Sequence, residues 1–425
     1  MAYMEDNRFK ANKKEIFLLI GAAAIYLFML ASKNAYTAQM LEIINNFHVT
    51  KAQASLSTTI YFIIYASMQL ILVKLLDKIN LKRYLLITSV LSGILSLIIP
   101  FCKEITQIYV IFALNGFLQA SIWPSCIQIS CNYLSKTMMY RANSVFSLMF
   151  PLSMVLDYGL SALFIRFYSW KISFWVFGFF QIISTVFFTL CITGFEKRKT
   201  SDVKKPKAKS KKEDTVLKPK NIKSVLSYCV FICSVTLLSN IIYYGVVNWM
   251  PSLLYDVFCV SSSLSTLITL SIPLSICMGP VFTVNLCKKI NPWIVTLGWM
   301  LATVWIAPLM AFVFGFNIVL SIILSLVLAL AFRSICNTYG VTIPTQTETP
   351  INSGALASLV NAFASFGASI GPLSVGYIVD KGGRKYSYLF LFVLTMILIA
   401  LTVFKVRKIK SNESIKLKGE DGLLC

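Results

Sequence analysis

Residues 196–223 read EKRKTSDVKKPKAKSKKEDTVLKPKNIK and separate two long apolar parts of the chain. The stretch carries twelve Lys or Arg residues and four Asp or Glu residues. A segment this polar cannot bury a core, so we expect a mobile linker. Over the whole chain 57% of residues are hydrophobic and 13% are charged, and the mean hydropathy is +0.74. Soluble domains carry about twice that share of charge, so the composition indicates an integral membrane protein.

Apolar runs of about 20 residues, the length of a membrane-spanning helix, occur six times before the linker and six times after it. The predicted spans are residues 16–43, 55–76, 84–102, 107–131, 142–165, 172–194, 224–250, 264–286, 293–315, 317–341, 354–378 and 386–404. The sequence therefore predicts an all-α membrane protein with twelve transmembrane helices in two pseudo-symmetric six-helix bundles. The bundles are residues 1–195 and 224–405, and a tail follows at 406–425.

A short internal repeat supports the two halves. LDKIN at 76–80 follows the second predicted span, and CKKIN at 287–291 follows the eighth. Repeats of this kind are typical of transporters in which two bundles face a central cavity.

Basic residues predict the orientation. From a cytoplasmic N-terminus, 30 of the 39 Lys and Arg residues lie in cytoplasmic segments, 7 lie outside, and Lys33 and Arg333 lie within spans. Without the linker the comparison is 18 to 7, which follows the positive-inside rule. We expect both termini in the cytoplasm and the protein in the plasma or inner membrane. Since topology explains the net charge of +22, we expect no nucleic-acid partner.

Three charged side chains stand out inside predicted spans, where an isolated charge is costly and usually faces a wet cavity or a partner. Lys33 and Asn34 lie in the polar half of the first span, and Arg333 and Asn337 share one face of the tenth. Asp157 lies midway along the fifth span. Two cations against one acid leave one positive charge in surplus. A cavity lined by these groups would favour an anion, and an Arg fork suits carboxylate or phosphate.

Other interpretations of these three residues stay open. Lys33 could extend to the outer interface, and Arg333 could form a structural salt bridge with Asp157. Asp157 is either a counter-ion or a protonatable coupling group, and the sequence does not decide between them.

Aromatic and amide side chains in the spans complete the candidate substrate site. They are Asn34, Tyr36, Tyr65, Trp123, Tyr243, Tyr244 and Asn337. The one histidine and the scattered cysteines have no metal-ligand spacing, so we expect no metal and no cofactor. The phosphate-loop pattern G-x-x-x-x-G-K-S/T is missing, which disfavours an ATP-driven pump. We expect a transporter and not an enzyme.

The segment VKLLDKINLKR, residues 73–83, resembles the loop signature of the major facilitator superfamily. It contains Asp77, Lys78, Lys82 and Arg83, while Val73 and Asn80 replace the two signature glycines. The resemblance implies transport by alternating access. It also implies that the four charged residues lock the cytoplasmic side in the outward-open state.

Four stretches resemble the organophosphate:phosphate antiporters, the glycerol-3-phosphate and hexose-phosphate transporter family. They are SKNAYTAQM (32–40), LNGFLQASIWPSCIQIS (114–130), YYGVVNWMPSLL (243–254) and VGYIVDKGG (375–383). The resemblance implies a phosphate site beside Lys33, but Ser32 and Tyr243 stand where that family has its two phosphate-binding arginines.

The predicted function is secondary active transport of a small anionic organic solute, of the organophosphate/phosphate exchange type. One alternative is a proton-coupled symporter of an organic or sugar-acid anion. Another is a membrane receptor or sensor that does not transport. The expected partners are the anionic solute and the lipid bilayer, and we expect a monomer.

Overall fold

The computed structural model describes residues 13–75, 80–193, 222–287, 289–343 and 353–421. These residues form helices and contain no strand. Eleven of the helices, counted with their short continuations, are long and apolar enough to cross a membrane. This confirms the predicted all-α membrane fold. Residues 196–221 of the predicted linker lie outside the described residues, and so do Asp77 and Lys78.

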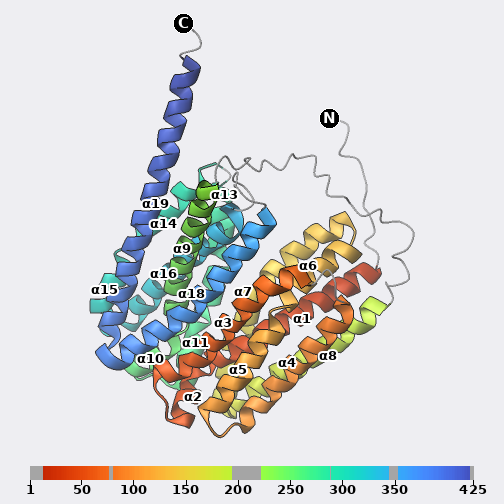
Figure 1. Cartoon of the computed structure of the whole chain (residues 1–425). Helices are drawn as coiled ribbons and strands as arrows, with labels where there is room; N and C mark the ends of the chain where they lie inside the picture. Colours follow the sequence, from red (N-terminus) through yellow and green to blue (C-terminus); the bar gives the residue numbers. More distant parts are fainter. Residues whose placement is uncertain (1–12, 76–79, 194–221, 288, 344–352, 422–425) are drawn as a thin grey trace.

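The described residues of the first half form eight α-helices and one 3-10 turn (Figure 1). They are α1 Lys13–Ala38, α2 Met40–Phe47, α3 Lys51–Leu75, α4 Leu81–Ile98, η2 Ile99–Phe101, α5 Ile105–Gln119, α6 Ile122–Tyr133, α7 Lys136–Phe167 and α8 Lys171–Thr193. Within this half α1 packs against α7 and α8, and α3 packs against α5.

The second half of the described chain is divided into more and shorter helices. They are α9 Ile222–Val247, α10 Met250–Phe258, α11 Ser262–Thr269, α12 Ser271–Ile276, α13 Met278–Cys287, α14 Pro292–Thr303, α15 Ile306–Val313, α16 Ile318–Asn337, the π-helix η4 Thr338–Thr342, α18 Ser353–Gly382 and α19 Arg384–Asp421. Helix α19 continues past residue 405, so the predicted tail begins inside it.

The eighth predicted span differs most from the expected single helix. Residues 264–286 are divided among α11, α12 and α13, with breaks at Leu270 and Cys277. Pro273 and Pro280 lie in the two later segments, and a proline has no N–H with which to continue the helical hydrogen bonds. Counting apolar residues cannot detect such breaks, because each short segment is as apolar as an unbroken helix.

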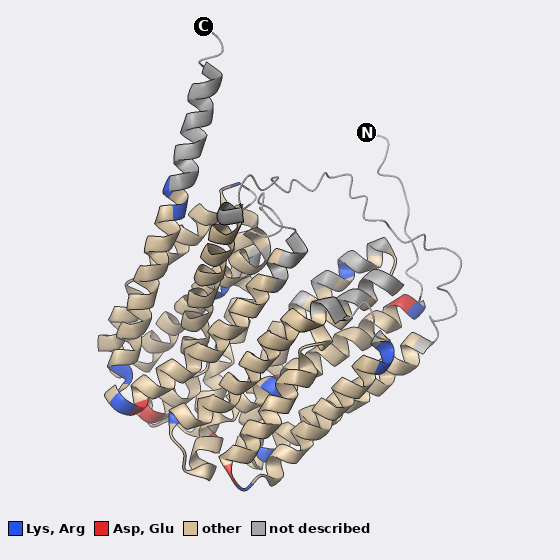
Figure 2. Ribbon diagram, in the orientation of Figure 1, with Lys and Arg blue, Asp and Glu red and all other residues tan. Residues whose placement is uncertain are grey.

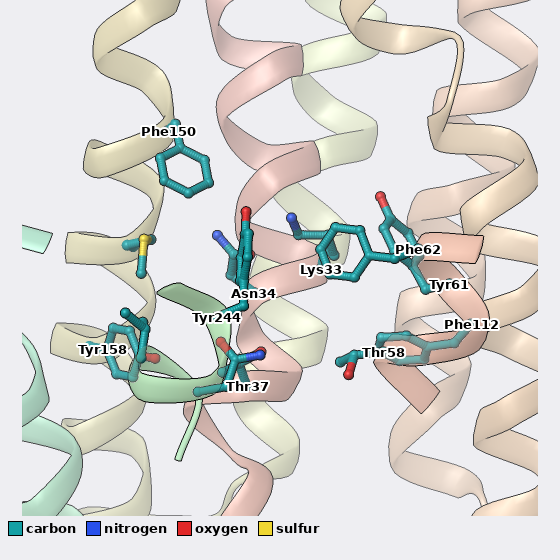
Figure 3. A pocket seen from close by; sticks show the side chains of 13 residues that line it. Lys33, Asn34, Thr37, Thr58, Tyr61, Phe62, Phe112, Phe150, Tyr158 and Tyr244 are labelled. Carbon is teal, nitrogen blue, oxygen red and sulfur yellow. The ribbon is translucent and has the colours of Figure 1, made fainter. Parts of the chain in front are cut away.

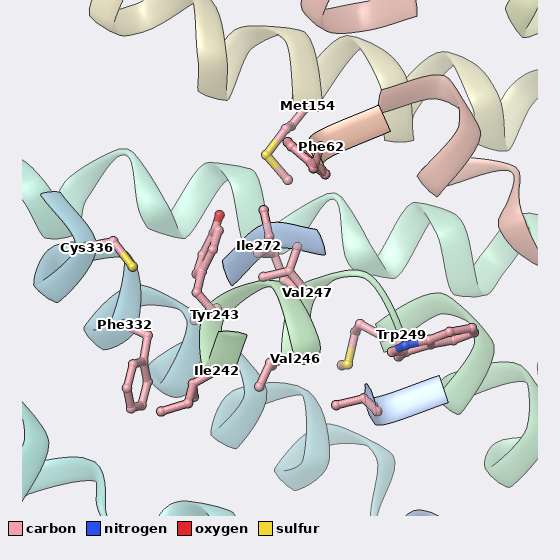
Figure 4. Packing of buried hydrophobic residues seen from close by; sticks show 14 of the residues in the cluster. Phe62, Met154, Ile242, Tyr243, Val246, Val247, Trp249, Ile272, Phe332 and Cys336 are labelled. Atoms are coloured by element: carbon pink, nitrogen blue, oxygen red, sulfur yellow. The ribbon is translucent and has the colours of Figure 1, made fainter. Parts of the chain in front are cut away.

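The two halves meet along helices that pack across the interface between them. Helix α3 packs against α18, and α7 packs against α11 and α12. A hydrophobic cluster crosses this interface: Phe62 and Met154 from the first half lie against Val247 and Ile272 from the second (Figure 4). Burial of this shared surface holds the halves together.

Contacts of charged side chains between the halves lie at one end of the described molecule. We call the end where α1 begins and α19 leaves the bundle the terminal face, and the other end the closed face. In Figure 1 the ribbons of the two halves converge at the closed face, below, and lie farther apart above. At the closed face Lys51 Nζ forms a salt bridge with Asp256 Oδ2 at 2.7 Å.

Asp380, near the end of α18, joins the halves at the same place. Its carboxylate accepts hydrogen bonds from the backbone N–H groups of Lys51 at 3.3 Å and Ala52 at 2.8 Å. These are the first residues of α3, where N–H groups lack helical partners and the helix dipole favours an anion. A residue of one half therefore caps a helix of the other.

Charged side chains lie mostly at the ends of the helices. In Figure 2 the middle of the described bundle is almost entirely uncharged, and Lys, Arg, Asp and Glu gather at the two faces. This pattern is expected for helices surrounded by hydrocarbon.

Candidate functional site

A pocket lies between the two halves, midway along the helices (Figure 3). It is lined by Lys33, Asn34, Thr37, Thr58, Tyr61, Phe62, Phe112, Phe150, Met154, Tyr158, Tyr244, Val247 and Asn248. The space left between these side chains is about 20 Å³, roughly what one water molecule needs.

Lys33 contributes the positive charge of the pocket. It lies on α1, half-buried, with Nζ 4.9 Å from the centroid of the Phe62 ring and 5.9 Å from that of Tyr61. The negative faces of aromatic rings attract a cation at such distances. The side chain thus lines the pocket and is held there by rings of α3.

Arg333 approaches the same region from the second half. Its guanidinium carbon lies 4.4 Å from the centroid of the Phe150 ring, which lines the pocket, and 5.7 Å from that of Tyr243. Arg333 is half-buried near the end of α16, and the half-buried Asn337 ends that helix. The π-helix η4 follows at once, and π-helical turns are frequent at functional sites.

Neither cation has an acidic partner in the part of the chain that the structure describes. No salt bridge there includes Lys33 or Arg333, so the expected alternative of an Arg333–Asp157 salt bridge is not formed in this conformation. The charge of each is compensated by aromatic faces. An anion entering the pocket would not have to displace a carboxylate.

Asp157 lies on α7 and is completely buried. Among the described residues, neither of its carboxyl oxygens has a hydrogen-bond partner. Asn34 lies close enough to influence the carboxyl, but its Nδ2 donates to Ser153 Oγ at 3.2 Å. The cation that acts on the carboxyl of Asp157 is Lys33. The structure thus brings the acid next to the pocket without pairing it.

The predicted aromatic residues take different places. Tyr244 lines the pocket, and Tyr243 lies fully buried under Arg333. Tyr65 stacks on Tyr61 with centroids 5.6 Å apart, one layer behind the pocket wall. Trp123 packs against Tyr26 and Phe146 in a separate cluster of the first half.

Tyr36 is also outside the pocket. It is fully buried, its hydroxyl donates to Ala54 O at 2.8 Å, and it accepts from Ser57 Oγ at 2.9 Å. These two hydrogen bonds of the Tyr36 hydroxyl join α1 to α3.

The loop signature is only partly described. Lys82 and Arg83 lie in the first turn of α4, and the Asn80 side chain caps that helix by accepting from Arg83 N at 3.3 Å. The predicted locking role of Asp77, Lys78, Lys82 and Arg83 stays a prediction.

The pocket also contains apolar residues that the sequence did not single out. Phe150 and Met154 come from α7, Phe62 from α3 and Phe112 from α5. Phe150, Met154 and Tyr158 are four residues apart, which places them on one helix face. That spacing was visible in the sequence, but lipid-facing phenylalanines show the same spacing.

The described residues contain no group of three His, Cys, Asp or Glu side chains that could hold a metal ion. The pocket lining offers one cation, Lys33, with several hydroxyl and amide groups and a wall of rings, and Arg333 lies against the ring of Phe150. Such a site can bind and orient an anion.

Comparisons with known proteins agree on the fold. A sequence model described as "Major Facilitator Superfamily" matches residues 21–348. The protein described as "Uncharacterized transporter YybO" from Bacillus subtilis (strain 168) is 24% identical over 144 residues, and this match spans 34% of the chain and 33% of that protein.

Solved structures match over nearly the full length. A bacterial homologue of the human lysosomal transporter Spinster, in an inward-facing and occupied conformation, has a TM-score of 0.76 at 15% identity and covers 93% of this chain and 98% of its own. The nucleoside transporter NupG, as a mutant, has a TM-score of 0.71 at 13% identity, with 92% and 99% covered. At these identities the similarity is one of fold.

Proposed function

The chain belongs to the Major Facilitator Superfamily, and from this premise we propose that it is a secondary active transporter of a small anionic organic solute. One observation carries the proposal: Lys33 and Arg333, from opposite halves, approach one pocket with no acidic partner among the described residues. A bound anion would supply the missing negative charge. Alternating access then follows if the halves rock about this site.

The orientation belongs to the same proposal. If the basic loops lie in the cytoplasm, the terminal face is cytoplasmic and the closed face is outside. The contacts of Lys51 and Asp380 would then close the outer side of the pocket. The conformation would be the one that exchanges solute with the cytoplasm.

The first candidate reaction is exchange of an organic phosphate for inorganic phosphate. The stretches that resemble the organophosphate:phosphate antiporters support it, and Arg333 would replace the two arginines that are absent at positions 32 and 243. The second candidate is proton-coupled uptake of an organic carboxylate. The unpaired, buried Asp157 favours this one.

Flux through proteoliposomes tests both candidates. Vesicles containing the purified protein are loaded with phosphate and given labelled glycerol 3-phosphate or gluconate outside, with and without a pH gradient. Phosphate-dependent uptake of glycerol 3-phosphate supports exchange, and gradient-dependent uptake of gluconate supports symport. Saturable binding of either anion without flux would instead identify a receptor and contradict the proposal.

Substitution of the two cations tests the site. Lys33→Ala and Arg333→Ala should each weaken binding of the transported anion by roughly 10- to 100-fold, because each removes a charge-assisted contact worth about 1.5–3 kcal/mol. Affinity is measured by competition of unlabelled anion against labelled uptake. Arg166→Ala is the matched control, because Arg166 is an exposed cation packed on an aromatic ring outside the pocket. Unchanged affinity in both pocket variants would disprove an anion site here.

A further inference from the structure

The lysine of the pocket depends on two aromatic rings for its position. The ammonium group of Lys33 lies 4.9 Å from the centroid of the Phe62 ring and 5.9 Å from that of Tyr61 (Figure 3). No described acid forms a salt bridge with Lys33, so the attraction of these two α3 rings holds the ammonium group in place. The geometry of the anion site therefore depends on what holds the rings.

The hydroxyl of Tyr61 is held by a buried hydrogen bond. It donates to Oε1 of Gln119, the last residue of α5, at 2.7 Å. Tyr61 is 2% exposed and Gln119 is 1% exposed, so water does not compete for this hydrogen bond. The Tyr61 ring also packs edge-on against the Phe62 ring, with centroids 5.2 Å apart and an interplanar angle of 87°. One contact of Gln119 therefore supports both rings that face the lysine.

Gln119 is itself fixed by a network of polar side chains inside the first half. Its Nε2 donates to Ser92 Oγ on α4 at 2.8 Å and lies 3.5 Å from Ser32 Oγ on α1. The Ser32 hydroxyl donates to Gln181 Oε1 on α8 at 2.7 Å. The network thus connects five helices, α1, α3, α4, α5 and α8. A buried network of this kind is rigid, because the loss of one member leaves its partner unpaired.

A glycine lets α5 come close enough to α3 for this contact. Gly116 lies three residues before Gln119 and therefore on the same face of the helix. A Cβ at position 116 would collide with the backbone oxygen of Tyr61. The backbone of α5 thus lies directly against α3 at Tyr61, which brings the Gln119 amide within reach of the hydroxyl.

We propose that Gln119 is a positioning residue of the anion site, although it does not line the pocket. By fixing the Tyr61 hydroxyl, it keeps the two rings and the Lys33 ammonium group in one orientation. A charge that is held in place before the anion arrives loses less freedom on binding, which raises the affinity. The effect on affinity rests on the proposed function, whereas the position of Lys33 can be tested without it.

The position of Lys33 is measured by nuclear magnetic resonance in the absence of any solute. The protein is labelled with carbon-13 at Cε of lysine, and the Lys33 signal is the one that Lys33→Ala removes. Because the faces of two rings lie near Lys33, its Cε protons should resonate upfield of those of exposed lysines. In Gln119→Leu this upfield shift should become smaller, because the rings lose their anchor. An unchanged shift would overturn the proposal.

Tyr61→Phe is a milder variant that breaks the same hydrogen bond and keeps the ring. It should reduce the upfield shift of the Lys33 signal as Gln119→Leu does. The double variant should show no further reduction, because both substitutions remove the same contact. A full wild-type shift in Tyr61→Phe would contradict the role of the hydroxyl and overturn the proposal.

Gln181→Leu is the matched control. Gln181 is an equally buried amide of the same network, but its hydrogen bonds are with the Ser32 hydroxyl and with Ser89 O. The substitution should lower the unfolding temperature and leave the Lys33 signal in place. An equal change of that signal in Gln119→Leu and Gln181→Leu would indicate a general loosening of the first half and overturn the proposal.

Anion affinity provides the functional measurement, by competition of unlabelled glycerol 3-phosphate or gluconate against labelled uptake. Gln119→Leu should weaken binding about 3- to 10-fold, the effect of one hydrogen bond, and Gln181→Leu should not weaken it. In a Lys33→Ala background Gln119→Leu should cause no further loss, because its effect passes through Lys33. A full additional loss in that background would overturn the proposal. If the wild type transports neither anion, the proposed function fails and the Lys33 signal still decides the role of Gln119.

Discussion

Lys33 and Arg333 show how a membrane protein can keep cations inside a bundle although no described residue is their acidic partner. Each lies over two aromatic rings, at 4.9 and 5.9 Å for Lys33 and at 4.4 and 5.7 Å for Arg333. A desolvated cation–π contact contributes about 2 kcal/mol, which offsets part of the cost of the buried charge. The rings hold the cations in place and leave their charge available to a solute.

Substitution of Tyr36 can distinguish a structural role of this side chain from a role in binding. Tyr36→Phe removes the hydroxyl that donates to Ala54 O and accepts from Ser57, so the free energy of unfolding should fall by about 0.5–1.5 kcal/mol. Anion affinity should not change, because the hydroxyl lies outside the pocket. Thermal unfolding in detergent and competition binding provide the two measurements.

The control for this prediction is Tyr168→Phe, because Tyr168 is 75% exposed. This substitution should change neither stability nor affinity. Reduced affinity in Tyr36→Phe with unchanged stability would return Tyr36 to the binding site, where the sequence predicted it.

In the second half, helices α9 and α18 pack closely because glycines line the contact between them. On α18, Gly367 faces Leu237 O and Asn240 on α9, and a Cβ on Gly371 would meet Ile241 O. Small residues allow such close approach of transmembrane helices, where no hydrophobic effect drives association. The contact between α9 and α18 positions Tyr244, which lines the pocket.

Gly371→Val should therefore destabilise the protein. The added side chain would collide with backbone atoms of α9, including Gly245 N and Ile241 Cα at 3.1 Å from the new Cβ. Overpacking of this kind costs about 1–3 kcal/mol, measured as a lower unfolding temperature in detergent.

Gly298→Val in α14 is the matched control. A Cβ on Gly298 meets no atom within 4 Å, and the change in helix propensity is the same. An equal fall in unfolding temperature for both variants would contradict the packing explanation.

For the protein as a whole, the closed face is where charged side chains of one half contact the other half. The Lys51–Asp256 salt bridge and the capping of α3 by Asp380 both join residues more than 200 positions apart in the chain. Asp256 and Asp380 are exposed, so solvent screening keeps each contribution small. Weak contacts of this kind suit a face that opens and closes in the proposed transport cycle.

Asp380→Asn should loosen this closure. The uncharged amide would accept more weakly from Lys51 N and Ala52 N, and it would lose the favourable interaction with the helix dipole. Hydrogen exchange of the amides at residues 51–54 should become about 3- to 10-fold faster, corresponding to roughly 1 kcal/mol. Mass spectrometry of the exchanged peptides measures this.

Glu104→Gln is the control, because Glu104 caps α5 within one half of the molecule. It should accelerate exchange at the start of α5 and leave residues 51–54 unchanged. If Asp380→Asn left exchange at residues 51–54 unchanged, its capping of α3 would not contribute to the closure.

The fold class followed from composition and apolar length. A backbone in hydrocarbon has to satisfy its hydrogen bonds internally, so each run of about 20 apolar residues has to be helical. Lys33, Arg333 and Asp157 stood out for the same reason, because charges are rare in such runs. The sequence also predicted the all-α fold of a major facilitator transporter. The match of residues 21–348 to the Major Facilitator Superfamily supports this fold.

The composition of the pocket depended on the tertiary structure. Tyr244 lines it whereas Tyr36 and Trp123 do not, although all three lie in predicted spans. The rotation of a transmembrane helix about its axis is set by packing against its neighbours, and aromatic residues occur on every face of these helices. The capping of α3 by Asp380 likewise arises only when distant segments meet. Apolar length is a local property that the sequence displays directly, whereas the direction in which a side chain points is decided by every helix packed around it.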